Sequence, residues 1–361
     1  MNKMSMTRRR SAARAKSYAR FYQRRGWKIV PVDARSKNPA RKGWPEIEFT
    51  PEDITANVGV VLGAVSGNLV DVDLDSADAL RLAPYFLPET LTFGRASKRA
   101  SHWLYVSKGV RSDKLWFGDP ADHDDRELVE IRANNASGPG CGHQTVFPGS
   151  THESGEAIEF DNECEPAQVD PGEIVWAVAK LATASAIAKT WTSGRHEKSL
   201  AISGGLLKAG WPAEDIRHLM AAVREACGDT PEEEADFGHD VESTIEKAER
   251  DGVEGLSGFG SLVQSGVLAD YEAKALERHS RSPATREREA FLASTRMGSS
   301  IAAEALIEAV EIDTDAITRA EAIMRVAWAK HRAAWVAEAT KPKPKPTRRP
   351  RVVLTLKEIE E

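Results

Sequence analysis

The chain has 361 residues, of which 41% are hydrophobic and 29% charged, and its formal net charge is −6. This length suits two domains with packed cores, and no run of about 18 apolar residues predicts a membrane-spanning helix. Three scattered cysteines are too few for a disulfide framework, and a basic N-terminus without an apolar stretch leads us to expect a cytoplasmic protein.

The first 45 residues are strongly basic, because Asp33 is the only acid among many Lys and Arg residues there. Such an excess favours a polyanionic partner, and a solvated basic helix that aids solubility is the alternative. Alanines and aromatics recur at helical spacing from Ser11 to Arg25. They predict a helix with one apolar and one basic face, which Gly26 ends.

Short strands and loops are predicted next. Residues 27–32 predict a strand, and residues 33–44 predict a loop. The runs 58–63 and 68–75 are rich in β-branched residues, and the short segment between them contains serine and glycine. We therefore expect these two runs to form a hairpin. The basic side chains of the loop are expected to be exposed: Arg35, Lys37, Arg41 and Lys42.

Ser76 is predicted to cap a helix over residues 77–83 that Pro84 ends or kinks. Alternating apolar residues then predict three further strands, at residues 102–106, 127–132 and 144–148. Beyond about Pro171 the strand signals fade and the apolar spacing becomes helical. Successive helices are predicted there, at residues 173–191, 198–210, 213–227 and 240–252.

These elements predict an α+β fold with a mixed or antiparallel sheet, followed by a helical domain. We expect four regions: an α+β catalytic domain over residues 1–170, a small helical domain over 171–260, a helical region over 261–340, and a basic Pro-rich linker and tail over 341–361. The sequence KPKPKPTRRPR gives the last region its stiffness and charge.

Three aspartates alternate with apolar residues in the predicted strand 68–75: Asp71, Asp73 and Asp75. Side chains at every second position of a strand share a face, so the three carboxylates converge. Neighbouring carboxylates repel one another, and a divalent cation such as Mg²⁺ relieves that repulsion. A solvent-exposed strand face that binds no metal is the alternative.

Two further segments carry polar groups suited to a phosphate ligand. Glu130 and Arg132 share one face of the predicted strand 127–132, where they form either a simple ion pair or part of a metal or phosphate site. The segment 94–105 supplies donors that suit a triphosphate: Arg95, Lys98, Arg99 and His102. The alternative for the histidine of the second segment, His102, is a purely structural role at the edge of a strand.

Taken in order, these motifs resemble the bifunctional primase/polymerase (prim-pol) family of the archaeo-eukaryotic primase superfamily, in its phage and plasmid type. Several motifs in one order are far more specific than any one of them. The resemblance covers residues 13–160 and is carried by YARFYQRRGWKIVPV, SKNPARKGW, NVGVVLGAVSGNLVDVDLD, SKRASHWLY, VEIR and HQTVFPGSTHESGEAIEF.

The resemblance implies roles for particular residues. Its pair of acids separated by one residue matches Asp73 and Asp75, and its third acid matches Glu130, so these three are the implied metal ligands. Asp71 stands where the family often has an aliphatic residue. The family's nucleotide-contacting histidine matches His102, although Ala100 occupies the usual serine position and Ser101 is adjacent. The implied catalytic residues are Asp73, Asp75, Glu130 and His102, and the implied nucleotide-binding residues are His102, Arg95, Lys98, Ser101 and Arg132.

The implied activity is that of a DNA primase/polymerase of a mobile element. With Mg²⁺ or Mn²⁺ it would transfer nucleotides from nucleoside triphosphates to primers on single-stranded DNA, without a membrane partner. The region from Trp191 onward resembles the small helical domains of phage and plasmid primases, which implies either a role in priming or a replicative helicase as a further partner. A helical packing domain without chemistry is the alternative.

Other functions stay open at this point. A non-catalytic, DNA-binding replication initiator or helicase-recruiting protein is one alternative, and a metal-dependent nuclease is another. No Walker-type glycine loop is present, so an ATP-driven helicase activity of this chain itself is not expected. A zinc site is a weaker hypothesis, because the spacing of the available ligands matches no standard finger: Cys141, His143, His152 and Cys164.

Overall fold

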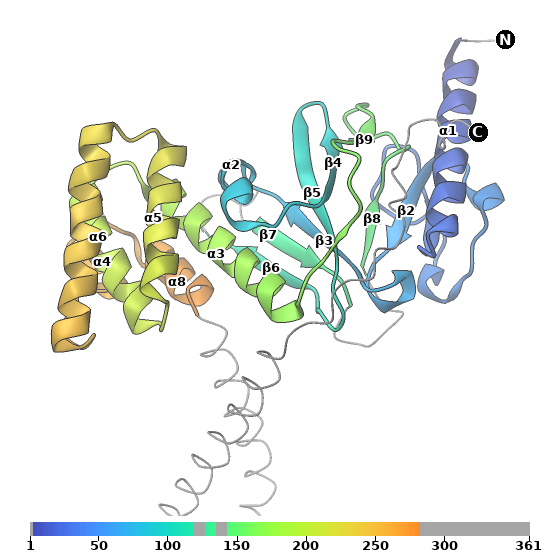
Figure 1. Cartoon of the computed structure of the whole chain (residues 1–361). Helices are drawn as coiled ribbons and strands as arrows, with labels where there is room; N and C mark the ends of the chain where they lie inside the picture. Colours follow the sequence, from blue (N-terminus) through green and yellow to red (C-terminus); the bar gives the residue numbers. More distant parts are fainter. Residues whose placement is uncertain (1–2, 119–126, 135–142, 282–361) are drawn as a thin grey trace, which may run out of the picture. The chain divides into compact units, whose positions relative to one another are not determined.

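Two antiparallel sheets form the N-terminal half of the protein in the computed structural model, which describes residues 3–118, 127–134 and 143–281 (Figure 1). The small sheet has the strand order β1-β2-β8. The large sheet has the order β6-β7-β3-β5-β4-β9, and β10 pairs in parallel with β5. The predicted α+β class with largely antiparallel sheets is confirmed.

The strand bounds show which predictions were close. The predicted strand 127–132 is observed as β7 (Glu127–Arg132), whereas four strands of the large sheet had no sequence-based prediction. The small sheet contains β1 (Ile29–Val32), β2 (Asn57–Val61) and β8 (Gln144–Val146). The other strands are β3 (Leu69–Leu74), β4 (Leu91–Arg95), β5 (Lys98–Val106), β6 (Asp113–Trp116), β9 (Ile158–Phe160) and β10 (Ala167–Gln168).

The predicted hairpin between residues 58–63 and 68–75 is wrong, because β2 and β3 lie in different sheets. A short 3₁₀ turn, Ala64–Ser66, and the left-handed backbone of Gly67 and Asn68 carry the chain from one sheet to the other. Every residue of both strands is buried. Each strand therefore has partners of its own on both sides, and the short segment between them joins two sheets instead of closing a hairpin.

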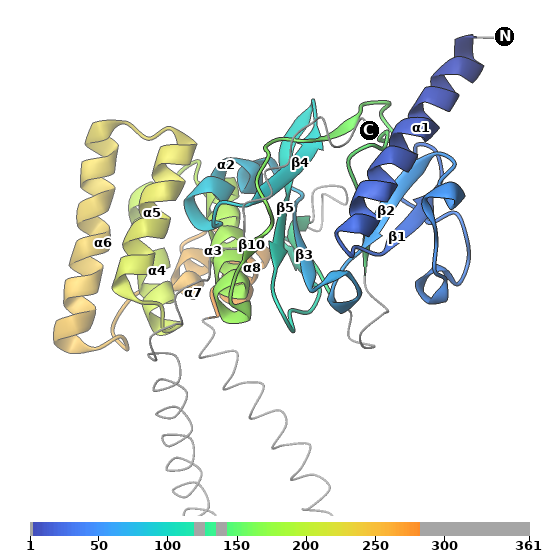
Figure 2. The same ribbon diagram turned by 45° about the vertical axis from the view of Figure 1, so that its right-hand side comes forward.

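The helix α1 (Lys3–Arg24) packs against the small sheet (Figure 2). Its predicted apolar face is confirmed, since Tyr18, Ala19 and Tyr22 are buried, and Tyr22 Oη donates a hydrogen bond to the carbonyl of Pro148. The chain leaves the helix at Gly26, whose φ of 74° is accessible to glycine at no steric cost. Aromatic packing thus attaches α1 to the small sheet.

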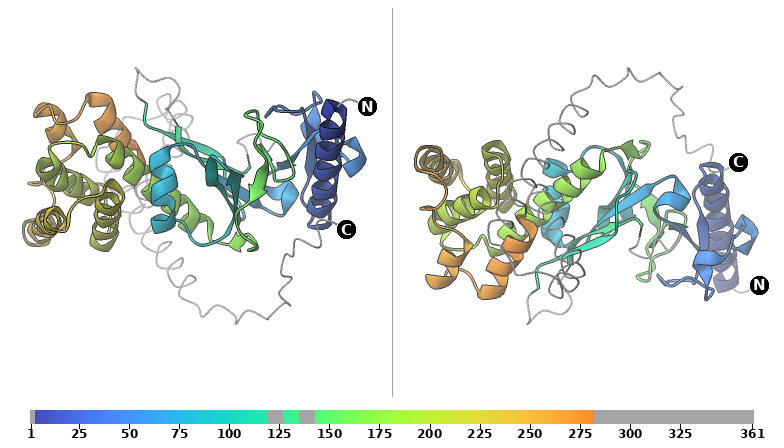
Figure 3. Two further views of the ribbon diagram at one scale, coloured as in Figure 1. Left: turned by 90° about the horizontal axis from the view of Figure 1, so that it is seen from above. Right: turned by 90° about the horizontal axis from the view of Figure 1, so that it is seen from below.

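The two faces of the large sheet have different partners (Figure 3). Val70, Val72 and Leu74 of β3 belong to a core that faces α2 (Ala77–Phe86) and α3 (Pro171–Thr190). Leu69 belongs instead to the core shared with α1 and the small sheet. Because side chains alternate along a strand, Asp71 and Asp73 point to the same side as Leu69, toward the small sheet.

Helices cover the other face of the large sheet and continue beyond it. Ser76 Oγ accepts a hydrogen bond from the backbone N–H of Ala79, as expected of a cap, and α2 runs through Pro84 to Phe86 rather than ending at the proline. The predicted helix 213–227 is observed as α5 (Ala213–Cys227). The other helices of this part are α4 (Arg195–Lys208), α6 (Pro231–Asp251), α7 (Phe259–Gln264) and α8 (Asp270–His279).

The cores of the helices and of the large sheet are continuous. Ile187 of α3, Leu219 of α5 and Leu276 of α8 belong to the same buried cluster as the strand residues on that face. The predicted borders at residues 170 and 260 stay predictions, and the helices and linker predicted beyond residue 281 lie outside the described residues. Within the described ranges, no helix is both long and apolar enough to cross a membrane.

Candidate active site

A cavity of about 550 Å³ opens on the face of the large sheet that is turned toward the small sheet. All eight residues that the sequence analysis assigned to catalysis or nucleotide binding line it. They come from the end of β3, from the β4–β5 hairpin and from β7: Asp73, Asp75, Arg95, Lys98, Ser101, His102, Glu130 and Arg132. Residues far apart in the chain therefore meet in one place.

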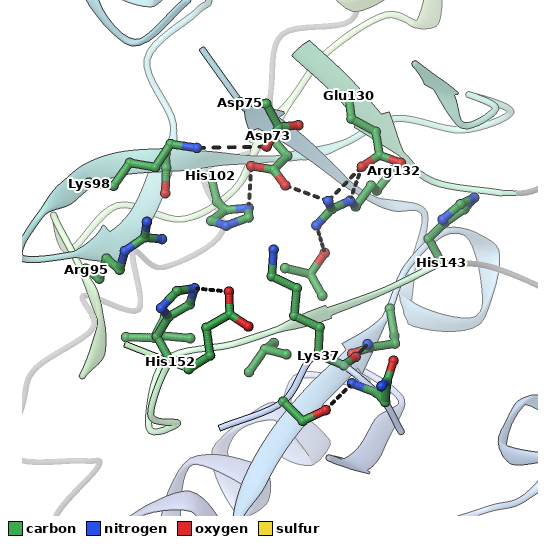
Figure 4. Close-up of a pocket in the computed structure, with 18 of the residues that line it drawn as sticks. Lys37, Asp73, Asp75, Arg95, Lys98, His102, Glu130, Arg132, His143 and His152 are labelled. Carbon is green, nitrogen blue, oxygen red and sulfur yellow. Dashed lines mark hydrogen bonds and ion pairs between the residues drawn. The ribbon is translucent and has the colours of Figure 1, made fainter. Parts of the chain in front are cut away.

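The strand register explains why the acids meet. Asp73 of β3 stands directly opposite Glu130 of β7 on one side and opposite His102 of β5 on the other. Asp75 follows the last residue of β3, and its backbone N–H continues the ladder by donating to the carbonyl of Leu128. Carboxylate oxygens of Asp73, Asp75 and Glu130 consequently all lie within 4.8 Å of one another. Figure 4 shows the three side chains gathered at one side of the cavity.

Two of the three acids are buried, Asp75 is partly exposed, and the cluster is only partly neutralised. Asp73 is 5% exposed and Glu130 2%. One nitrogen of Arg132, Nη2, lies 2.6 Å from Asp73 Oδ2 and 2.7 Å from Glu130 Oε2, so a single cation bridges two of the three acids. The nearest Lys98 and Lys114 contacts are longer, at 3.8 Å to Asp75 and 3.6 Å to Glu130.

Asp75 is the least compensated of the three acids. Its Oδ2 is buried and has no hydrogen-bond partner among the described residues. Burial, and then the negative charge of Asp73, raise the pKa of Asp75 to about 6. For Asp73 burial acts in the same direction, but His102 and Arg132 outweigh it and lower the pKa. The cluster thus has an oxygen that lacks a partner and a carboxyl that resists ionisation.

These observations fit a divalent cation. Mg²⁺ and Mn²⁺ take oxygen ligands, and a cluster of carboxylates with an orphaned oxygen has the donors that such an ion needs. Two of these acids lie on paired strands, Asp73 on β3 and Glu130 on β7, and Asp75 directly follows β3. Asp73, Asp75 and Glu130 are therefore the residues that would hold the metal.

His102 is held from two directions. Its ring stacks on Phe93, with the ring centroids 4.4 Å apart and the planes at 10°. Its Nδ1 lies 3.1 Å from Asp71 Oδ2 and 3.6 Å from Asp73 Oδ1. Burial acts to lower the pKa of His102, but the charges of Asp73 and Asp71 outweigh burial, and the pKa is raised. Both carboxylates therefore favour the protonated form of the imidazole that lines the cavity.

Other donors line the cavity, and one predicted donor does not. Arg95 lines the wall but shares its Nε with Ser97 and Glu156, at 3.1 and 3.4 Å. Arg99 pairs with Asp161 at 2.8 Å and is absent from the lining. The predicted group of four donors on residues 94–105 is thus reduced to three.

The cavity also contains residues that the sequence analysis did not assign to catalysis or nucleotide binding. Lys37, from the loop 33–44, extends into the cavity toward His102 (Figure 4), and Thr145 of β8 lines it too. His143, directly before β8, and His152, after it, also line the cavity, and the sequence analysis named them only in the zinc hypothesis. Burial lowers the pKa of His143 and of His152. Lys37 lies in the quoted motif SKNPARKGW and was predicted to be exposed, which is confirmed. The sequence did not predict that Lys37 points into the cavity, because this depends on how the loop 33–44 packs against segments that are distant in the chain.

The zinc hypothesis gains no support. Cys141 lies outside the described residues, and Cys164 is an exposed free cysteine. Within residues 3–118, 127–134 and 143–281, the one group of three or more potential metal ligands is Asp73, Asp75 and Glu130.

A comparison with known protein families finds the same family that the sequence motifs resemble. Residues 19–173 match the family described as bifunctional DNA primase/polymerase, N-terminal. No curated protein and no solved structure matches the chain. The matched range includes α1 from Ala19 onward, both sheets, and every residue that lines the cavity.

Proposed function

We propose that this chain is a metal-dependent primase/polymerase of a mobile element that makes or extends primers on single-stranded DNA, because residues 19–173 match the bifunctional DNA primase/polymerase family. This match implies a nucleotidyltransferase in general terms. The substrates, the metal and the residues below are our proposal. The observation that carries it is the cluster of Asp73, Asp75 and Glu130 with one orphaned oxygen.

In this proposal the acid cluster holds Mg²⁺ or Mn²⁺. Asp73, Asp75 and Glu130 would hold this ion, which when bound would supply Lewis-acid activation for the primer 3′-hydroxyl and charge neutralisation for the α-phosphate and the leaving pyrophosphate. Arg132 keeps Asp73 and Glu130 in place through its contacts of 2.6 and 2.7 Å, and it limits the repulsion between them. The rigid strands β3 and β7 fix the spacing of the ligands.

The cationic wall of the cavity would hold the triphosphate. His102, Lys98 and Arg95 line one side, Ser101 adds a hydroxyl, and Lys37 enters from the opposite side. Together they offer several N–H donors, which suits phosphate oxygens. The reaction forms a bond from the 3′-oxygen to the α-phosphorus and breaks the bond from that phosphorus to the β-bridging oxygen, which leaves as pyrophosphate while the hydroxyl proton passes to solvent.

Among the basic residues of the first 45, those of the loop that follows β1 are the stronger candidates for contacting the template. Several basic residues of the N-terminal stretch already pair with acids: Arg14 with Glu159, Lys16 and Arg20 with Glu52, Arg25 with Glu165, and Lys28 with Glu48. Arg35, Lys37 and Lys42 are exposed and make no ion pair with another described residue. These three are better placed to contact phosphates of a single strand near the cavity.

The test is nucleotide incorporation by the full chain on a primed single-stranded DNA template with Mg²⁺ or Mn²⁺. We expect labelled product from the wild type and none from the double variant Asp73→Ala, Asp75→Ala. Asp113→Asn is a matched control, because Asp113 is an exposed acid of the neighbouring strand β6 that does not line the cavity. It should incorporate nucleotides at the wild-type rate.

Three outcomes would contradict the proposal. DNA binding without product under either metal would favour the replication initiator or helicase-recruiting protein. Shortening of the template would favour the nuclease. Incorporation by the double variant at the wild-type rate would show that other residues hold the metal.

A further inference from the structure

Asp71 is a buried carboxylate next to the acid cluster that takes no part in it. It is fully buried, and its oxygens are not among the three ligand groups that lie within 4.8 Å of one another. Thr145 Oγ1 of β8 donates a hydrogen bond to Asp71 Oδ2 at 2.7 Å. Asp71 therefore joins the large sheet to the small sheet at the back of the cavity.

The second partner of Asp71 is His102. In the register of β3 and β5, His102 stands opposite Asp73 and not opposite Asp71. Its Nδ1 nevertheless lies closer to Asp71, at 3.1 and 3.2 Å from the two carboxylate oxygens, than to Asp73, at 3.6 Å. The ring is thus turned along the strand toward Asp71.

Two contacts fix the ring completely. Phe93 covers one face of the imidazole, and Asp71 accepts a hydrogen bond from Nδ1. Since a carboxylate only accepts, Nδ1 must be the donor. His102 lines the cavity, and Nε2 is the ring nitrogen that Asp71 leaves for a ligand. A histidine ligand whose second nitrogen is held by a carboxylate has a defined orientation and proton position, as in other protein sites.

We propose that Asp71 is a positioning residue that directs His102 Nε2 toward the nucleotide, with Thr145 holding Asp71 in turn. This proposal rests on the proposed function, because it assigns the ligand of His102 as a nucleoside triphosphate. It explains why β3 carries, besides Asp73, an aspartate that supplies no metal ligand. Asp71 acts through His102 and does not touch the substrate.

The test measures the dissociation constant for dATP with Mg²⁺ and the KM and kcat of incorporation. Asp71→Val removes the acceptor and keeps a strand-forming side chain. We expect at least about a 10-fold increase in dissociation constant and KM, the range for losing a hydrogen bond to a charged group, with a smaller change in kcat. Asp71→Asn keeps an acceptor oxygen, so the increase should stay within about threefold.

A double-mutant cycle separates positioning from general damage to the sheet. In the background His102→Ala, Asp71→Val should weaken dATP binding no further, because its effect passes through the imidazole. Tyr105→Phe is the matched control, since it removes a buried hydrogen bond on the opposite face of β5 and should leave dATP binding unchanged. If Asp71→Val fails to fold, Thr145→Val should weaken dATP binding in the same direction, and only when His102 is present.

Wild-type binding by Asp71→Val, or an equal loss in both backgrounds, would overturn the proposal. If the wild type binds no dATP, the proposed function fails instead, and ¹⁵N signals of the His102 ring then test the positioning alone. The ring should carry its proton on Nδ1 in the wild type and lose this preference in Asp71→Val. An unchanged ring signal would refute the role of Asp71.

Discussion

The substitution Asp75→Asn should stabilise the metal-free protein at neutral pH. Burial and the charge of Asp73 raise the pKa of Asp75 from an ordinary value of 3.8 to about 6, so the folded protein disfavours the ionised carboxylate. Each pKa unit corresponds to about 1.4 kcal/mol, which places the penalty near 3 kcal/mol at most. The side chain is 28% exposed, and solvent screening reduces the expected gain to about 1–2 kcal/mol.

The sign of the pH dependence follows from linkage. A carboxyl whose pKa is raised on folding favours the folded state at pH values below its unfolded pKa, and this contribution is lost as pH rises through about 6. Asparagine is neutral throughout. The difference in free energy of unfolding between Asp75→Asn and the wild type should therefore be small near pH 4 and reach its full size near pH 7.

Urea unfolding in EDTA at a series of pH values measures this difference, and a thermal scan should show a rise in Tm of about 2–5 °C at pH 7. Mg²⁺ should reduce or reverse the advantage, because it binds the folded wild type. An Asp75→Asn protein that is less stable than the wild type at pH 7 in EDTA would refute the inference that the cluster is strained by uncompensated charge.

Three other substitutions test the site and the core. Arg132→Ala leaves Asp73 and Glu130 without their shared cation and should lower the free energy of unfolding in EDTA by about 3–5 kcal/mol, with partial recovery in Mg²⁺; no loss would show that the bridge is unimportant. Lys37→Ala should raise KM for the nucleotide about 3- to 10-fold at unchanged Tm, because the residue is exposed yet enters the cavity; an unchanged KM would exclude a phosphate contact. Ile187→Ala should cost about 2–5 kcal/mol of stability in urea with KM unaffected, since this side chain lies in the core on the far face of the sheet.

Periodicity predicted the elements that have a clear apolar pattern. The strand 127–132 and the helix 213–227 agree with β7 and α5 at both ends, because each contains a regular alternation or a regular helical stripe. The strands β4, β6, β9 and β10 were missed, since they are short and their sequences show little alternation. The hairpin of residues 58–63 and 68–75 failed because partner choice depends on contacts between distant segments.

The same limit applies to the site. Alternation placed Asp71 and Asp73 on one face of a strand, and the family motifs indicated the acids that the structure brings together. The sequence did not show that Asp71 turns toward His102 and Thr145 while Asp75 keeps an orphaned oxygen. These differences arise from the register of β3 with β5 and from the approach of β8, which are properties of tertiary structure.

Nucleotide incorporation by Asp75→Asn is the most direct test of the claim that the carboxylates of β3 and β7 hold a catalytic metal. With a primed single-stranded template and Mg²⁺ or Mn²⁺, this variant should fold at least as stably as the wild type in EDTA and yet incorporate no nucleotide. Incorporation at the wild-type rate by the folded variant would contradict the assignment of the metal site.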